Sequence, residues 1–146
     1  MRFWDSSAVV SLILEEAASG HMRGLHGSDR DMLVWWGTPI ECHSGLARGE
    51  RAGRIPADVK AEADRALREM SLYWTEVEPV ASIRDAAIRL VGVHDLRAAD
   101  ALQLAAAVLS RPSESDLWNS CALTGALRSL RRKRAWSYWV RDSNDN

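Results

Sequence analysis

Short apolar runs alternate along this chain with longer segments in which apolar residues recur every three or four positions. The runs predict β-strands buried on both faces, over residues 2–4, 32–36 and 75–80, with a further strand within 117–124. The periodic segments predict helices: one after Asp5 with the apolar face Val9, Leu12 and Ile13, one around 20–28, one beginning at Thr38, and three over 56–70, 83–91 and 98–109. Strands that alternate with helices predict an α/β fold whose parallel sheet is covered on both faces.

The composition fits one domain of ordinary size. Of the 146 residues, 47% are hydrophobic, which is enough for a single sizeable core. We expect residues 1–140 to form this domain and the polar end, residues 141–146, to be a disordered tail. The formal net charge of -1 gives no general attraction to nucleic acid or to anionic membranes. Binding to a polyanion therefore depends on local patches of charge.

The chain carries no predicted membrane or export segment. Its apolar run AVVSLIL is far shorter than a membrane span, and acidic residues lie on both sides of it. The two cysteines, Cys42 and Cys121, match neither a disulfide scaffold nor the CxxC spacing of zinc sites. A cytoplasmic protein without membrane contact is the simplest expectation.

Two helix starts carry polar residues that call for an explanation. At the first, Thr38 suits the N-cap and Pro39 the first helical position, and Glu41 then completes a capping box. At the second, Asp100 opens a helix of alanine and leucine with the predicted buried face Leu102, Ala105, Ala106 and Leu109, in which Gln103 is nearly the only polar interruption. A carboxylate so close to a core needs a cation, hydrogen-bond donors or a helix N-terminus to offset its desolvation.

Three acids, Asp5, Glu41 and Asp100, stand at or near the starts of predicted helices. Taken singly, each is explained by the helix dipole and the free amides of a first turn, and the capping box explains Glu41 completely. Taken together, they indicate a shared binding site, because ligands of open α/β sheets collect beyond the carboxyl ends of the strands. Converging carboxylates repel one another unless they hold protons or bind a divalent cation such as Mg²⁺. Such a site suits metal-assisted hydrolysis of a phosphodiester.

Three segments in this order and at these separations resemble the PIN-domain family, specifically the VapC-type toxins of bacterial toxin-antitoxin pairs: RFWDSSAVVSLILEE, TPIECHSGLARGERAG and HDLRAADALQLAAAVL. The resemblance extends from Met1 to about Leu109. It implies a three-layer α/β/α sandwich with a central parallel sheet, and an endoribonuclease that cleaves RNA with Mg²⁺ or Mn²⁺ held by acids. It also implies an antitoxin partner and a homodimer.

Matching motif positions assign residues to this implied site. The acidic cluster comprises Asp5, Glu41 and Asp100: Asp5 and Asp100 hold the metal, and Glu41 binds it through water or positions the attacking water. Ser7 falls at a polar position near the metal. Arg48 matches a position where such toxins often carry an arginine, which leaves contact with the substrate and a solvated helix face as equal alternatives.

The C-terminal quarter departs from the family pattern. When Leu127 and Trp136 are matched to the family's leucine and aromatic residue, Thr124 falls where a fourth aspartate is expected and Ala135 replaces a glycine. Neither Asp116 nor Asn119 has the spacing to substitute for it. We therefore expect a remodelled end and a weakened activity.

Other candidate residues have simpler interpretations. His43 lies two positions from Glu41 on the helix and is expected to be a surface or half-buried residue rather than a ligand. Trp35, Trp36 and Trp74 could stack on bases, but core or interface packing is favoured. The basic run 131–134 suits RNA phosphates and an exposed helix end equally well.

The sequence thus predicts an Mg²⁺-dependent endoribonuclease, the toxin of a type II toxin-antitoxin pair. One alternative is a PIN-fold module that binds RNA or an antitoxin without cleavage, because Thr124 stands at the fourth acidic position. Another is a structure-selective DNA nuclease. A zinc enzyme is disfavoured, since the four histidines show no zinc-like grouping.

Overall fold

The computed structural model describes residues 1–110 and 121–122 of the chain. In chain order its elements are β1 (Arg2–Trp4), α1 (Ser6–Ile13), α2 (Ser19–Ser28), β2 (Met32–Trp35), α3 (Thr38–Arg51), α4 (Ala57–Ser71), β3 (Thr75–Val77), α5 (Ala81–Val93), α6 (Ala98–Leu109) and β4 (Cys121–Ala122). The last strand falls within the predicted 117–124. Several expectations lie outside the described residues: Thr124, Ala135, the basic run 131–134, the domain end at 140 and the tail 141–146.

The described strands form one parallel sheet in the order β3-β2-β1-β4. Strand β1 lies beside β2, with Phe3 opposite Leu33, and beside β4, with Phe3 opposite Cys121. Strand β2 also pairs with β3, with Val34 opposite Glu76. All three pairings are parallel, so the predicted parallel sheet is confirmed. A parallel sheet aligns the carboxyl ends of its strands along one edge, and the segments after β1 and β2 leave from that edge.

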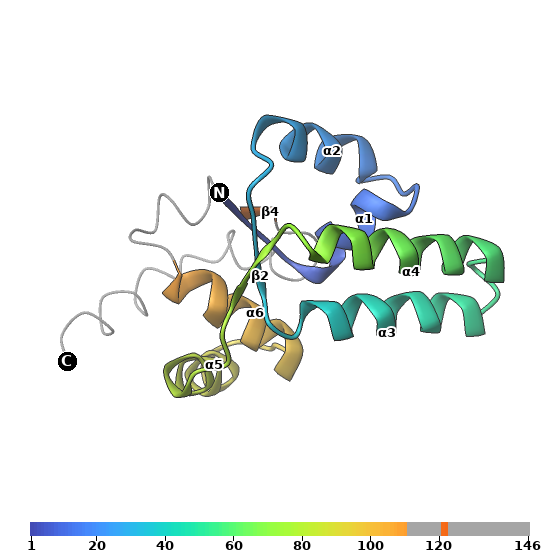
Figure 1. Cartoon of the computed structure of the whole chain (residues 1–146). Helices are drawn as coiled ribbons and strands as arrows, with labels where there is room; N and C mark the ends of the chain where they lie inside the picture. The colour runs from blue at the N-terminus through green and yellow to red at the C-terminus, as the bar shows by residue number, and fades with distance from the viewer. Residues whose placement is uncertain (111–120, 123–146) are drawn as a thin grey trace.

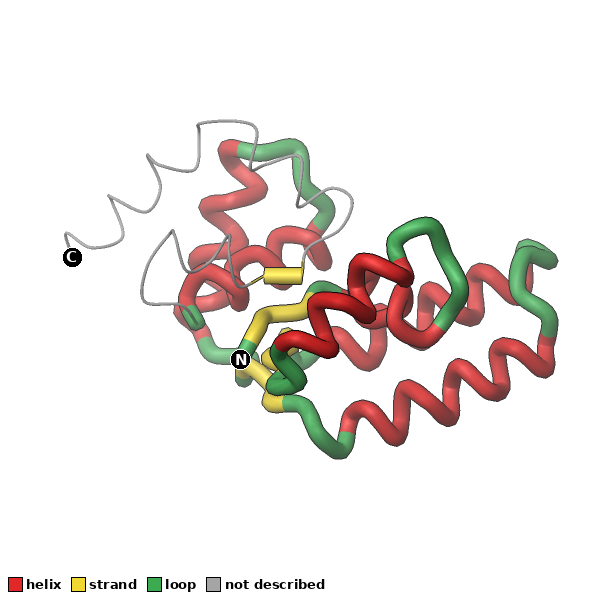
Figure 2. Tube along the Cα trace, turned by 90° about the horizontal axis from the view of Figure 1, so that it is seen from above, coloured by secondary structure: helices red, strands yellow, loops and turns green. Residues whose placement is uncertain are grey.

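Helices cover both faces of the sheet. Alternate residues of a strand point to opposite faces, and apolar side chains on both faces must be buried. Phe3, Leu33 and Trp35 pack in one cluster with buried residues of α5 and α6. Trp4, Met32 and Val34 pack in a second cluster with residues of α1, α2 and α4. Figures 1 and 2 show the strands running between the pair α5 and α6 and the other helices. The predicted three-layer α/β/α sandwich is confirmed.

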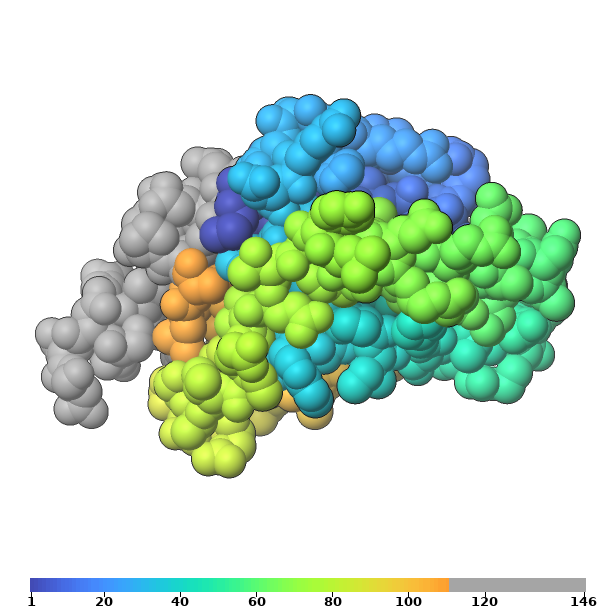
Figure 3. Space-filling model, in the orientation of Figure 1, coloured from blue at the N-terminus to red at the C-terminus, as the bar shows by residue number. Residues whose placement is uncertain are grey.

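Helices α3 and α4 form an antiparallel hairpin beside the sheet, and they lie next to each other on the face seen in Figure 3. Two glycines, one in the turn and one near the end of α3, permit the close return of the chain. Gly53 has a φ of 68°, a left-handed conformation that costs glycine little. A Cβ at Gly49 would collide with the side chain of Ile55, so the absence of a side chain there lets the turn fold back onto α3.

The predicted capping box at the start of α3 is wrong. The N-cap is Gly37, which makes no side-chain cap, and Thr38 is already the first helical residue. The amide of Glu41 donates to the carbonyl of Gly37 at 3.1 Å as an ordinary helical bond. The helix begins one residue earlier than the pattern predicted because the backbone of Gly37 already has a helical conformation. The Glu41 side chain is therefore left for partners elsewhere in the fold.

The predicted buried face of α6 is also wrong in part. Leu109 is 45% exposed and Leu102 is half-buried, whereas Ala101, Gln103 and the run 104–107 are buried. Helix α6 packs on α5 and on the sheet at once, so its buried surface is wider than a single stripe. Small alanine side chains permit this burial on several sides. None of the helices in the described part of the chain is both long and apolar enough to cross a membrane.

Candidate active site

Asp5 is placed by the end of β1 and the start of α1. It is the N-cap of α1, and its Oδ1 accepts hydrogen bonds from the Ala8 amide at 2.7 Å and from Ser7 Oγ at 2.9 Å. Only 3% of the residue is exposed. The helix cap expected of an acid at this position is confirmed, and Ser7, the residue predicted to lie near the metal, donates to Asp5.

Glu41 lies in the first turn of α3 and is half-buried. Its Oε2 accepts two hydrogen bonds, one from Ser6 Oγ of α1 at 2.9 Å and one from Gln103 Nε2 of α6 at 3.1 Å. The same Gln103 nitrogen lies 3.4 Å from Thr38 Oγ1. One carboxylate oxygen thus joins three helices that are distant in the sequence.

The pKa of the Glu41 carboxyl depends on burial, on hydrogen bonds and on the charges of the other two acids. Burial is the largest cause that raises the pKa of the Glu41 carboxyl above its ordinary value. Hydrogen bonds from Gln103 and Ser6 oppose this rise in pKa. The negative charges of Asp100, in the first turn of α6, and of Asp5 add to it. The charges of Asp5 and Asp100 therefore reach Glu41, although the three acids do not form a tight cluster within the described residues.

Cys42, the next residue along α3, is fully buried beside this neighbourhood. Its Sγ lies 3.5 Å from the Ser6 carbonyl oxygen. Burial, with smaller contributions from Glu41 and Asp5, raises the pKa of the thiol to about 12. The thiol is therefore neutral at physiological pH, which excludes Cys42 as a thiolate nucleophile.

A groove of about 560 Å³ opens beside Glu41, between α1 and the α3–α4 hairpin. Ser6, Ser7 and Glu41 line it together with two arginines, Arg48 of α3 and Arg54 of the hairpin turn. Apolar side chains complete the lining, among them Val10, Leu46, Ile55 and Val59. The exposed Arg48, placed by sequence at a substrate position or on a solvated face, lies on this groove.

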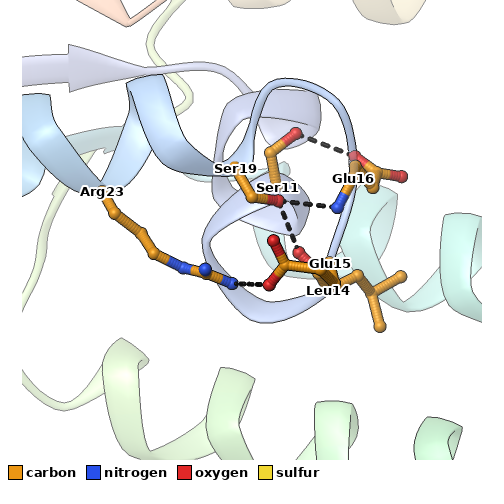
Figure 4. Close-up of polar contacts among 6 residues, drawn as sticks. All are labelled: Ser11, Leu14, Glu15, Glu16, Ser19 and Arg23. Carbon is orange, nitrogen blue, oxygen red and sulfur yellow. Dashed lines mark hydrogen bonds and ion pairs between the residues drawn. The ribbon is translucent and has the colours of Figure 1, made fainter.

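Two acids of the α1–α2 connection, Glu15 and Glu16, also line the groove. Figure 4 shows how they are held. Arg23 pairs with Glu15 at 2.6 Å, and Ser11 Oγ donates to Glu16 Oε2 at 2.8 Å. Ser19 accepts from the Glu16 amide at 2.8 Å and donates to the Leu14 carbonyl at 2.7 Å. These contacts hold the connection between α1 and α2 and give each carboxylate a partner within this segment.

The acids near Glu41 offer the oxygen donors that Mg²⁺ prefers, but they are not grouped as a set of metal ligands. Within residues 1–110 and 121–122, no three Asp, Glu, His or Cys side chains are grouped closely enough to hold a metal ion. Neither Glu41 nor Asp100 forms an ion pair with an arginine or lysine in this part of the chain. Mg²⁺ usually keeps several waters and binds one or two carboxylates, which suits negative charge gathered in this way.

Sequence reasoning missed three members of this arrangement. The sequence pattern indicated Ser7 rather than Ser6, and it assigned Thr38 to the N-cap of a helix. It marked Gln103 only as a polar interruption in an apolar helix. Gln103 is the case in which a signal existed, because a buried amide requires a partner. No local pattern identifies that partner as Glu41, 62 residues earlier in the chain.

The remaining candidates lie elsewhere. His43 is half-buried as expected, with Nδ1 at 2.9 Å from Asp64 Oδ1 of α4. Trp35 and Trp74 belong to the core, which confirms the packing interpretation for them. Trp36 follows the last residue of β2 and is 47% exposed, so it does not belong to the core.

Comparisons with known proteins find a similarity in structure but no significant match in sequence. No model of a protein family matches the sequence. No curated protein matches it significantly either. Among solved structures, the chain is similar to the crystal structure of VapC20 of Mycobacterium tuberculosis, described as a toxin that cleaves the sarcin-ricin loop. The match has a TM-score of 0.56 and 18% sequence identity, and it covers 74% of this chain and 82% of VapC20. At this identity the match establishes the architecture, and the chain has a PIN-like α/β/α fold.

Proposed function

We propose that this protein is a metal-dependent endoribonuclease of the VapC type, acting as the toxin of a type II toxin-antitoxin pair. The observation that carries the proposal is Glu41, which lines a groove in a PIN-like fold and lies within the electrostatic reach of Asp5 and Asp100. The toxin to which the fold is similar cleaves an RNA, which supports RNA as the substrate class.

We assign separate roles to the three acids. Asp5 and Asp100 hold Mg²⁺ or Mn²⁺, which supplies charge neutralisation at the phosphate and makes water more acidic. Glu41 orients the attacking water. Its Oε2 already accepts from Ser6 and Gln103, so the other oxygen, Oε1, is the atom assigned to the water. A half-buried carboxylate with a raised pKa is also a better proton acceptor than an exposed one.

Attack by an external water leaves the 2′-hydroxyl of the RNA unused. The products are then a 5′-phosphate and a 3′-hydroxyl end. Arg48 and Arg54, which line the groove beside Glu41, are assigned to the phosphates that flank the cleaved bond. An antitoxin protein and a second copy of the chain complete the proposed assembly.

The second candidate is a module of the same fold that binds RNA or an antitoxin without cleaving. It is favoured by the absence of a ready three-residue metal group in the described residues, and by Thr124 at the position of the fourth acid. A missing carboxylate weakens metal binding or water positioning, whereas it leaves the groove intact.

The test is cleavage of a mixed pool of small RNAs by the purified protein with Mg²⁺ or Mn²⁺. Asp100→Asn is compared with Asp58→Asn, the same change at an exposed acid in the first turn of α4. We expect the wild type and Asp58→Asn to cut and Asp100→Asn to be inactive. If none of the three cuts but Thr124→Asp does, the second candidate is correct for the natural chain. Equal cleavage by all three contradicts the proposed site and indicates a contaminating nuclease.

A further inference from the structure

Gln103 is an amide buried where the helix is otherwise apolar. It is 2% exposed, and the next four residues of α6, Leu104 to Ala107, are buried and apolar. Its Nε2 donates to Glu41 Oε2, while its Oε1 has no hydrogen-bond partner among the residues that the structure describes. A buried carbonyl oxygen without a partner is costly, and an apolar side chain of similar size avoids that cost. The packing of α6 alone therefore does not account for this residue.

We propose that Gln103 is a positioning residue that holds the Glu41 carboxylate in its working orientation; this inference rests on the function proposed above. The distance of 3.1 Å from Nε2 to Glu41 Oε2 fixes one oxygen of the carboxylate, and Ser6 Oγ fixes the same oxygen from α1. Two donors on one oxygen restrict rotation of the carboxylate and leave its second oxygen for water.

The orientation of the Gln103 amide follows from the same contacts. A carboxylate only accepts hydrogen bonds, so the NH₂ end must face Glu41 and the carbonyl end is left without a partner. Thr38 Oγ1, 3.4 Å from Nε2, can accept the second amide hydrogen. The pairing with Glu41 therefore explains why Oε1 is unsatisfied.

Gln103 also links two of the three acids. It lies three residues after Asp100 on α6, so both project from neighbouring positions on that helix. Its bond to Glu41 ties this side of α6 to the first turn of α3. The residue thereby sets the position of Glu41 relative to Asp100.

The decisive variant is Gln103→Met, which keeps the size of the side chain and removes both the donor and the unsatisfied oxygen. Leu104→Met is the matched control, because Leu104 is equally buried on the same helix and packs in the cluster with α5. Three quantities are measured for each: single-turnover RNA cleavage, Mn²⁺ binding by electron paramagnetic resonance, and the melting temperature in EDTA.

We expect Gln103→Met to lower the single-turnover rate of cleavage by about 10- to 100-fold, the usual effect of removing a side chain that orients a ligand or catalytic group. We expect its melting temperature to equal or exceed that of the wild type, and Leu104→Met to cleave normally. Wild-type cleavage in Gln103→Met overturns the inference. So does a loss of cleavage that accompanies a lower melting temperature, because a purely structural role predicts that combination.

A double variant tests whether Gln103 affects cleavage through Glu41 or independently of it. In a Glu41→Gln background, adding Gln103→Met should cause no further loss of single-turnover cleavage, since the group that Gln103 positions is already altered. Independent, multiplicative losses overturn the inference. A wild-type protein that neither binds Mn²⁺ nor cleaves RNA instead overturns the proposed function, and with it this role. Wild-type cleavage that Gln103→Met leaves unchanged overturns this role alone.

Discussion

At the scale of single residues, Glu41 concentrates the chemistry of the site. Its carboxylate is half-buried, accepts two hydrogen bonds through one oxygen and lies in the field of Asp5 and Asp100. Burial, together with the two negative charges, outweighs the hydrogen bonds and raises the pKa of Glu41, a shift that is common for carboxyl groups at functional sites.

The raised pKa predicts how stability depends on pH. A carboxyl that binds protons more tightly in the folded chain than in the unfolded chain lowers the free energy of unfolding as pH rises. The loss begins near the ordinary value of 4.5 and is complete above the folded pKa. We expect Glu41→Gln, measured in EDTA, to lack this part of the pH dependence and to melt at a higher temperature than the wild type at neutral pH. A Glu41→Gln protein that melts lower at neutral pH contradicts this account.

A divalent cation bound at the site should offset the loss of stability that the ionised Glu41 causes. A ligand that binds only the folded chain stabilises it by about 2.7 kcal/mol at a concentration one hundred times its dissociation constant. We expect Mg²⁺ or Mn²⁺ to raise the melting temperature of the wild type, to raise that of Asp58→Asn equally, and to have a much smaller effect on Asp100→Asn. Equal shifts in all three proteins would show that the cation binds away from Asp100.

Sequence alone could indicate Asp5, Glu41 and Asp100, because acids at helix starts follow a local rule. It could not indicate Ser6 or Gln103 as partners of Glu41, since these contacts depend on how α1, α3 and α6 pack. The predicted capping box failed for the same reason. Glu41 satisfies the pattern of a box, but its side chain finds donors across the fold.

At the scale of elements, the α3–α4 hairpin forms one wall of the groove, and its turn is closed by the contact between Gly49 and Ile55. We expect Gly49→Ala to destabilise the protein by about 1–3 kcal/mol, because a Cβ there overlaps the Ile55 side chain. Gly24→Ala in α2 is the matched control. Nothing lies within 4 Å of a Cβ at Gly24, so alanine should stabilise that helix by about 0.5–1 kcal/mol. Urea unfolding measures both, and similar effects of the two changes would contradict the proposed closure of the turn.

Element boundaries were predicted closely where punctuation is strong. Pro56 precedes α4 as expected, whereas β3 ends at Val77, three residues before the predicted end at residue 80. The buried face of α6 was harder to predict. Its alanines bury readily on any side, so periodicity alone did not show that the helix packs on α5 and on the sheet at once.

At the scale of the whole molecule, the parallel sheet and its two covered faces followed from alternating strands and helices. The alternation along β1 and β2 sends Phe3 and Trp4 to opposite cores, as a sheet between two layers of helices requires. The order of the strands and the place of the groove could not be read from the sequence, because both depend on contacts between distant segments.

Because the net charge of the chain is near zero, RNA binding depends on local positive charge, which Arg48 and Arg54 supply at the groove. We expect Arg54→Ala to weaken RNA binding across sequences and to reduce the slope of log affinity against log salt by about 0.7, the value for one contact to a single-stranded phosphate. Arg30→Ala, an exposed arginine that does not line the groove, should leave the slope unchanged. An equal effect of both substitutions would place the RNA elsewhere.

Hydrolysis at this site is best tested by identifying the ends of RNA cut by the wild type in Mg²⁺, beside Asp100→Asn and an EDTA control. We expect fragments with 5′-phosphate and 3′-hydroxyl ends that are absent from both controls. Fragments with 2′,3′-cyclic phosphate ends, or the same fragments from Asp100→Asn, would contradict hydrolysis by water at the site formed by Asp5, Glu41 and Asp100.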